Sequence, residues 1–192
     1  MGETVRRSLP PGIGIGCHFV DGLPRLTAYY TGMRRGEILG LTGDRVKLDR
    51  RIILLGPEDT KEGQWKRVPI HRDLVYILQE VLKVRYIQDA KVFRIDGKPV
   101  SADSIRKPWD KAVNAIGLDP PPTFHGLRHT WKTNARRSGM DTEIREAILG
   151  HADKTSTVRG RYGAISDEEL RKAINLMTFE HGETEIWLSG KK

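Results

Sequence analysis

Apolar residues recur three and four positions apart along much of the chain, a spacing that places them on one face of an α-helix. Residues typical of helix ends punctuate this pattern. Thr123, Asp141 and Ser166 are placed to cap first turns, and Gly139 and Gly150 are placed to end helices. The predicted helices cover residues 23–31, from about 34 to 39, 71–86, 101–116, 123–139, 141–150 and 166–177.

A different pattern covers residues 46–70. Residues 46–48 and 51–55 alternate loosely between apolar and polar positions, and residues 66–70 form a return strand after the turn-rich segment 56–63. This alternation predicts strands among the helices. The sequence therefore predicts a mostly helical α+β domain with a small antiparallel sheet. A further short strand is expected at residues 184–188, with no obvious partner nearby.

Length and charge narrow the class of protein. A chain of 192 residues is long enough for one well-buried domain and short for two. Its 33 Lys and Arg residues exceed its 25 Asp and Glu residues, which gives a formal charge of +8 and a pI of about 9.7. This excess favours a polyanionic partner such as nucleic acid, although ribosomal and merely soluble basic proteins share it.

Cysteine and hydropathy exclude several other classes. The single cysteine, Cys17, rules out an internal disulfide framework and a cysteine-based metal cluster, which fits a reducing compartment. No apolar run approaches the length of a membrane span, and the N-terminus has no secretory signal pattern. We expect a protein of the cytoplasm, associated with the nucleoid in a bacterium, and no membrane partner.

The predicted helix at residues 123–139 carries candidate chemistry. His125 and Arg128 lie three positions apart, so their side chains emerge from one helix face. Arginine offers a fork of donors to two anionic oxygens, and histidine can transfer a proton near neutral pH, so the pair suits a phosphate. A charged face is also typical of plain solvated surface. The same face carries His129, Lys132 and Arg136, opposite an apolar face of Leu127, Trp131 and Ala135.

Arg34 lies at the predicted start of a helix, where the dipole disfavours a cation unless an anion binds there. Glu37, three positions on, is placed to orient Arg34 from behind or to pair with Arg35 or Lys47 at the surface. An ordinary solvated arginine is the alternative. Lys61 lies in the turn between two predicted strands, and its position alone assigns it no role.

Five motifs, in this order along the chain, resemble those of the tyrosine recombinases, the phage integrase family. The resemblance covers roughly residues 21–178, and an ordered set is far more specific than any one motif. The motifs are Thr31-Gly-Met-Arg-Arg-Gly-Glu-Ile-Leu, Thr60-Lys-Glu-Gly with Arg67-Val-Pro, Phe124-His-Gly-Leu-Arg-His, Leu149-Gly-His and Arg161-Tyr-Gly.

The resemblance implies a site and a reaction. Tyr162 would attack a DNA phosphodiester, giving a 3′-phosphotyrosine, and the bond energy kept there implies that neither ATP nor a metal ion nor any other cofactor is needed. The implied catalytic residues are Tyr162, Arg34, Arg128, His125, Lys61 and His151, with Glu37 supporting Arg34. The implied DNA-binding residues are Arg35, His129, Lys132, Arg136, Arg159 and Arg161.

The individual roles follow the chemistry of each side chain. The two arginines would neutralise the non-bridging oxygens, His125 would assist deprotonation of Tyr162, and Lys61 would protonate the leaving 5′ oxygen. His151 would hydrogen-bond the phosphate or steady the site. The implied partner is double-stranded DNA at a specific recombination site, with a tetrameric synapse and accessory DNA-bending proteins.

The same resemblance implies a domain organisation. Residues 1–20 are expected to be a flexible or truncated lead-in, residues 21–178 the catalytic domain, and residues 179–192 a tail whose strand acts in trans. We expect the N-terminal core-binding domain of most members to be absent, and the interval from His151 to Tyr162 is longer than the family pattern. Two alternatives stay open: a relaxing activity like that of type IB topoisomerases, and a DNA-binding remnant that does not recombine.

Overall fold

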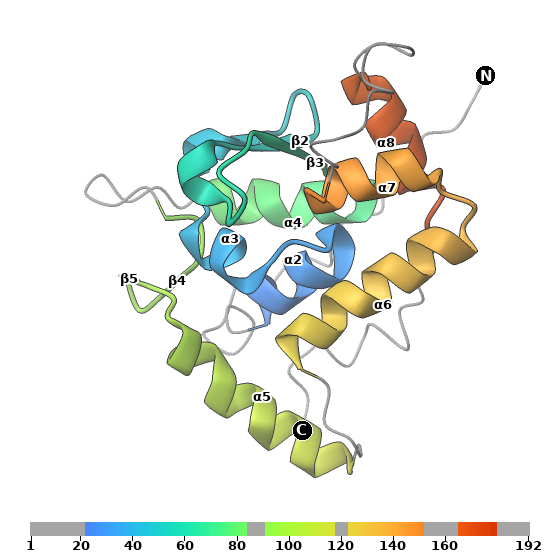
Figure 1. The fold of residues 1–192 in the computed structure, drawn as a ribbon. Coiled ribbons are helices and arrows are strands. Elements are labelled where there is room, and N and C mark those ends of the chain that lie inside the picture. Colours follow the sequence, from blue (N-terminus) through green and yellow to red (C-terminus); the bar gives the residue numbers. More distant parts are fainter. Residues whose placement is uncertain (1–21, 84–90, 118–122, 152–164, 180–192) are drawn as a thin grey trace, which may run out of the picture.

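A computed structural model describes residues 22–83, 91–117, 123–151 and 165–179, and Figure 1 shows their arrangement. Helices dominate this part of the chain. The α-helices are α2 (Leu23–Thr31), α3 (Arg35–Gly40), α4 (Arg72–Lys83), α5 (Ala102–Ile116), α6 (Phe124–Arg137), α7 (Thr142–Leu149) and α8 (Asp167–Asn175). The strands are β1 (Val46–Lys47), β2 (Ile52–Leu55), β3 (Lys66–Pro69), β4 (Arg94–Ile95) and β5 (Lys98–Pro99), with two 3₁₀ turns at Gly43–Arg45 and Pro57–Asp59.

The helix caps read from the sequence are present in the structure. The Thr123 hydroxyl accepts from the Gly126 amide at 2.9 Å, and Asp141 and Ser166 cap α7 and α8 in the same way. Each bond satisfies an amide that the first turn leaves without an intrahelical partner. The predicted helices are therefore confirmed, apart from residues 84–86, which lie outside the described residues as does the expected strand at 184–188.

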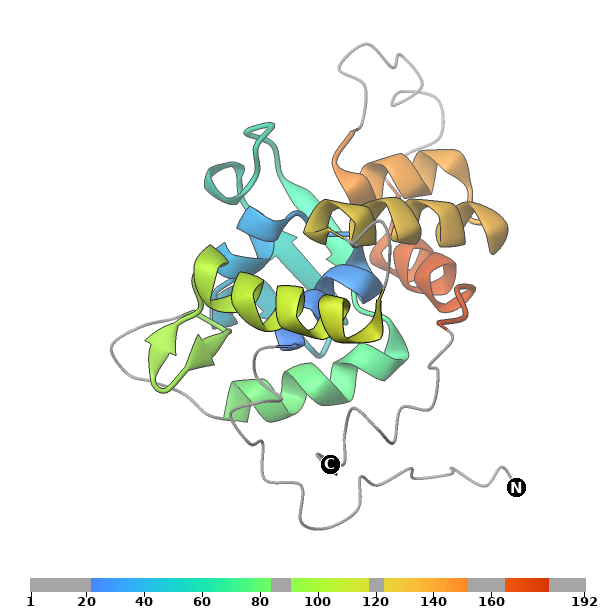
Figure 2. The same cartoon turned by 90° about the horizontal axis from the view of Figure 1, so that it is seen from below.

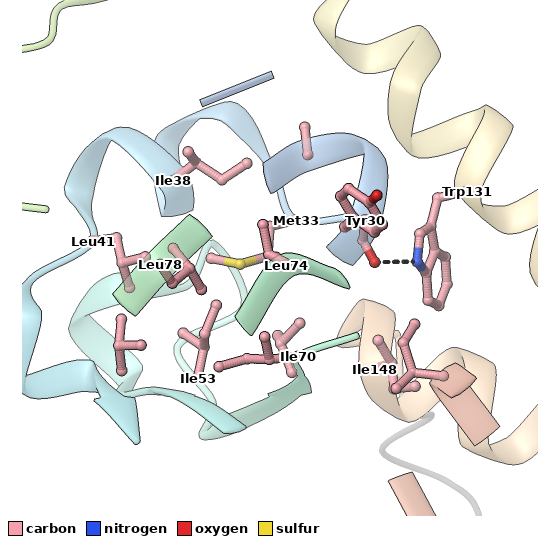
Figure 3. Close-up of a cluster of buried hydrophobic side chains, with 14 of the residues drawn as sticks. Tyr30, Met33, Ile38, Leu41, Ile53, Ile70, Leu74, Leu78, Trp131 and Ile148 are labelled. Carbon is pink, nitrogen blue, oxygen red and sulfur yellow. Dashed lines mark hydrogen bonds between the residues drawn. The ribbon is translucent and has the colours of Figure 1, made fainter. Parts of the chain in front are cut away.

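The three predicted strands form an antiparallel sheet in the order β1-β2-β3, with Ile53 opposite Val68. Helices α7 and α8 contact β3, and side chains from α3, α4 and the sheet meet in the buried cluster of Figure 3. Turning the molecule shows α6, α7 and α8 gathered on one side, with the β4–β5 hairpin on the other (Figure 2). The mostly helical α+β class is confirmed.

The hairpin of β4 and β5 was not predicted from the sequence. Asp96 and Gly97 form its two-residue turn with φ of 50° and 75°. An Asp-Gly pair is a typical residue choice for such a turn, because both central residues take a positive φ. The Asp-Gly pair therefore indicated a turn in the sequence. Each strand covers only two residues, however, which is too few to show an alternation of apolar and polar positions. Among the described residues, no helix has the length and apolar character needed to cross a bilayer.

Trp131 joins α6 to α2 at the centre of the core. Its side chain is fully buried, and its indole N–H donates to the Tyr30 carbonyl at 3.1 Å (Figure 3). Gly32 ends α2 with φ of 64°, and a Cβ at Gly32 would lie 2.8 Å from the indole ring. Glycine is thus required here twice, by the left-handed backbone and by the close approach of Trp131.

This double requirement gives a stability prediction. We expect Gly32→Ala to lower the free energy of unfolding by about 3 kcal/mol, the sum of left-handed strain and overpacking against Trp131. Gly117→Ala is the matched control, because Gly117 also has a positive φ of 66° but has no neighbouring atom within 4 Å of its Cβ position. Its cost is about 1 kcal/mol. Equal losses in chemical denaturation of the two variants would contradict the packing argument.

Candidate active site

Arg34 and Glu37 form the first part of the site, at the start of α3. Arg34 is the N-cap residue with extended backbone, and its amide donates to Glu37 Oε2 at 2.9 Å. Its guanidinium Nη1 also donates, to Glu37 Oε1 at 3.1 Å. Glu37 therefore orients Arg34 from behind, as one of the two predicted arrangements had it. The alternative pairing of Glu37 with Arg35 or Lys47 is wrong, because the carboxylate points inward.

The third donor to Glu37 is Lys66, the first residue of β3, whose Nζ lies 2.8 Å from Oε2. Both side chains are only 2% exposed. Burial alone would raise the pKa of Glu37, but the charge and hydrogen bond of Lys66, together with Arg34, hold this pKa below its usual value. The carboxylate is thus charged and fully paired inside the protein.

Arg128 is the second arginine, and it is also buried, with 6% of the residue exposed. Its Nη1 donates to the Gly32 carbonyl at 2.7 Å, and its Nη2 donates to the Leu149 carbonyl at 2.8 Å. Nη2 also lies 2.9 Å from His151 Nε2. Burial, and then the nearby charge of Arg34, lower the pKa of Arg128, so the two guanidinium groups lie close enough to repel each other.

The position of Arg128 corrects the sequence analysis, which put it on one charged face with His125. His125 is exposed, and its ring packs edge-to-face on His129 with centroids 4.7 Å apart. Three positions turn the helix by about 300°, so the two directions differ by about 60°. This difference lets Arg128 reach into the core while His125 stays outside. The other predicted members of that face, His129, Lys132 and Arg136, are exposed.

His151 follows Gly150, the left-handed C-cap of α7, and contacts groups on both sides of its ring. Nε2 faces Arg128, and Nδ1 lies 3.0 Å from Glu146 Oε2. A guanidinium can only donate, so Nε2 accepts and the ring proton lies on Nδ1. His151 is thus held between a cation and a carboxylate.

Two residues of the turn between β2 and β3 behave differently. The Lys61 side chain is exposed, and it is not among the contacts of Arg34 or Arg128. Its neighbour Glu62 turns inward, where Oε2 and Oε1 accept from Arg34 Nη1 at 2.8 Å and Nη2 at 2.5 Å. Glu62 therefore binds the guanidinium of Arg34, which the sequence analysis expected to bind a phosphate.

Lys66 and Glu62 were not among the candidate residues. Lys66 is detectable in principle, because Lys66, Val68 and Ile70 alternate on the inward face of the predicted strand and a lysine there needs a buried partner. Glu62 has no comparable sequence signature, since its contact depends on how the turn folds back over α3.

Residues 24–169 match the family model of the phage integrase family. The chain belongs to this family. It is 30% identical to tyrosine recombinase XerC 2 of Ralstonia nicotianae over 149 residues, which cover 74% of this chain and 42% of that protein. The chain thus spans about half the length of the curated relatives that it matches.

Solved structures agree on the fold of this phage integrase family member. The integrase of mycobacterium phage Brujita superposes with a TM-score of 0.62 at 18% identity, covering 95% of this chain and 63% of that one. The Tn1549 transposon integrase in complex with transposon right end DNA has a TM-score of 0.54 at 21% identity, covering 78% and 55%. These neighbours support the fold assignment.

The family resemblance named some residues that the structure does not describe. Tyr162, Arg159 and Arg161 lie outside the described residues, so their predicted roles stay predictions. Arg35 lies beside the site on an exposed turn of α3. The described part of the site therefore consists of two arginines, two carboxylates, one histidine and a buried lysine.

The buried Glu37–Lys66 pair gives a prediction for the site. We expect Glu37→Gln to lower the free energy of unfolding near neutral pH by about 3 kcal/mol, because it leaves the ammonium of Lys66 buried without a counter-charge. The loss should shrink above the pKa of Lys66, about 8, where that lysine is neutral.

Glu168→Gln is the control, since it removes one carboxylate from an exposed pair with Lys172. Such surface pairs contribute little, so the change should be far smaller. Chemical denaturation at two pH values measures both variants. A Glu37→Gln loss equal to the control would contradict the burial argument.

Proposed function

We propose that this chain is the catalytic part of a site-specific DNA recombinase that cleaves and rejoins strands through a 3′-phosphotyrosine. The proposal rests on one observation. Arg34, at the start of α3, and Arg128, on α6, lie close together beside His151 although they are far apart in the sequence. Two repelling guanidinium groups held close together favour an anion between them. A phosphodiester has the charge and the oxygen geometry for that place.

The proposed reaction assigns one step to each group. The Tyr162 hydroxyl loses its proton with help from His125 and attacks phosphorus, so a tyrosine O–P bond forms while the bond to the 5′ oxygen breaks. Arg34 and Arg128 neutralise the non-bridging oxygens, and His151 steadies Arg128. Lys61 gives a proton to the departing 5′ oxygen. Reversal of these steps by another 5′ hydroxyl rejoins the strands.

DNA as the substrate is supported by charge and by the structural neighbours. The chain carries a formal charge of +8, and the exposed residues Arg35, Lys132 and Arg136 lie on the elements that build the site. The Tn1549 integrase, which shares the fold, was solved with transposon DNA. A specific recombination site, a tetrameric synapse and accessory bending proteins complete the proposal.

The nucleophile has a direct test. A free tyrosine has a pKa near 10 and attacks poorly at neutral pH, so an adduct requires the activating groups around it. With a nicked suicide duplex carrying the cognate site, we expect a covalent adduct that survives denaturant and maps to Tyr162. Tyr162→Phe should abolish the adduct and keep duplex affinity, while Tyr76→Phe, at an exposed tyrosine of α4, should change neither.

The outcomes of this test separate the alternatives. An adduct that persists in Tyr162→Phe removes the nucleophile assignment. Duplex binding without an adduct on any site favours a DNA-binding remnant, and relaxation of supercoiled plasmid without exchange between two sites favours a topoisomerase-like activity.

The Glu62 contact gives a second prediction, because a phosphate cannot use the fork of Arg34 until Glu62 leaves it. We expect Glu62→Gln to tighten duplex binding by about 10-fold, the equivalent of about 1.4 kcal/mol for a lost competing ion pair. The control is Glu58→Gln in the same turn, which removes a carboxylate from Arg45 instead.

Fluorescence anisotropy at one salt concentration measures these affinities. The gain from Glu62→Gln should exceed that from Glu58→Gln and should vanish when Arg34 is alanine in both proteins. A gain that is equal at the two positions, or that persists without Arg34, would reduce the effect to net charge.

A further inference from the structure

Lys66 is a buried, charged residue that the reaction proposed above does not use. It begins β3 and is 4% exposed, with its side chain on the inward face. Its ammonium donates to Glu37 Oε2 at 2.8 Å. The other two donors to that carboxylate belong to Arg34, through its amide and its Nη1. Lys66 therefore bonds directly to the carboxylate that orients Arg34.

The aliphatic stem of Lys66 makes a second contact, with the segment that holds Arg128. A Cβ at Gly150 would lie 3.2 Å from Lys66 Cδ and 3.8 Å from Cε, so the stem packs directly on this glycine. Gly150 sits between Leu149, whose carbonyl accepts from Arg128, and His151, whose ring faces it. A substitution of Lys66 would therefore disturb the positions of both Arg34 and Arg128.

We propose that Lys66 is a positioning residue of the phosphate site: its ammonium orients Arg34 through Glu37, and its stem supports residues 149–151 beneath Arg128. The inference rests on the proposed function and deepens it. Lys66 touches neither the phosphate nor the leaving group, so it differs in role from Lys61, the proton donor on the neighbouring turn.

The charges around Lys66 make this role dependent on pH. Burial, and after it the charges of Arg128 and Arg34, lower the pKa of Lys66 to about 8 against the opposing effect of Glu37. Glu62 also approaches, with Oε2 4.0 Å from the Gly150 Cβ position. The carboxylates of the neighbouring helices are bonded elsewhere, Glu146 of α7 to Lys132 and His151, and Asp167 of α8 to Arg50 and Arg67.

Activity and stability should therefore change in opposite directions above pH 8. Loss of the Lys66 proton releases Glu37 and with it Arg34, so strand cleavage falls. Between a folded pKa of about 8 and the usual 10.5, the unfolded chain binds more protons at this lysine than the folded chain. The contribution of Lys66 to the free energy of unfolding then rises with pH. A purely structural lysine would instead make cleavage follow stability.

The first experiment is the pH profile of single-turnover cleavage of the nicked suicide duplex. Wild type should lose activity with a midpoint of about 8. Lys66→Arg, which stays charged, should lack this decline. Lys66→Met keeps the stem without the charge and should be at least about 10-fold slower at neutral pH, with no midpoint near 8. Lys91→Met is the control, because Lys91 also donates within the fold, to the Gly40 carbonyl at 2.7 Å.

A substrate with sulfur at the bridging 5′ position separates positioning from proton donation, because a thiolate leaves without a proton. It should restore cleavage to Lys61→Ala but not to Lys66→Met. Restoration of Lys66→Met would make Lys66 the proton donor and overturn the proposal. A wild-type decline that Lys66→Arg retains would overturn it as well, provided that circular dichroism shows this variant to be folded.

A binding cycle tests the same role without any cleavage, so that failure of the proposed reaction is distinguishable from failure of this inference. Duplex affinity is measured for Lys66→Met, Arg34→Ala and the double variant. If Lys66 acts through Arg34, the loss caused by Lys66→Met disappears once Arg34 is alanine. Additive losses overturn the inference, whether or not an adduct forms.

Discussion

The carboxylate of Glu37 is the group on which the candidate site depends. A charged carboxylate is costly to bury unless donors surround it, and here three donors do so, from the Arg34 amide, the Arg34 guanidinium and Lys66. These donors come from the start of α3 and the start of β3. One buried charge thus joins a helix to a sheet and at the same time sets the direction of an arginine, so the stability of the fold and the geometry of the site share one interaction.

Charge balance explains why the described site contains two carboxylates. Arg34, Arg128 and Lys66 bring three positive charges into one region, and burial, followed by their mutual repulsion, lowers the pKa of both Arg128 and Lys66. Glu37 balances one of these charges permanently. Glu62, on a surface turn and partly exposed, balances another. Binding of a phosphate would then be an exchange of anions, with little change in the net charge of the site.

The sequence predicted the helices and strands more completely than the contacts between their side chains. The helices were predictable because several independent sequence features indicated them, such as a capping residue at Thr123 or Ser166 and apolar residues at helical spacing. Arg34 and Glu37 are three positions apart on one helix, which made their pairing predictable too. Lys66 and Glu62 meet Glu37 and Arg34 only after the sheet folds back on α3. The local alternation of the strand indicates that Lys66 is buried, but it does not indicate which carboxylate Lys66 meets. The placement of Arg128 on one charged face with His125 was wrong for the same reason.

Arg128 shows how the architecture itself supplies a site. Gly32 is the C-cap of α2 and Leu149 is the last residue of α7, so the carbonyls that accept from Arg128 are among those that helix ends leave without partners. A cation at two helix C-termini is stabilised by both dipoles, which offsets part of its desolvation. A guanidinium has five N–H donors. Two of these donors bond to the helix carbonyls and one faces His151. The remaining donors point in few directions, so the helix ends fix the direction from which an anion could approach Arg128.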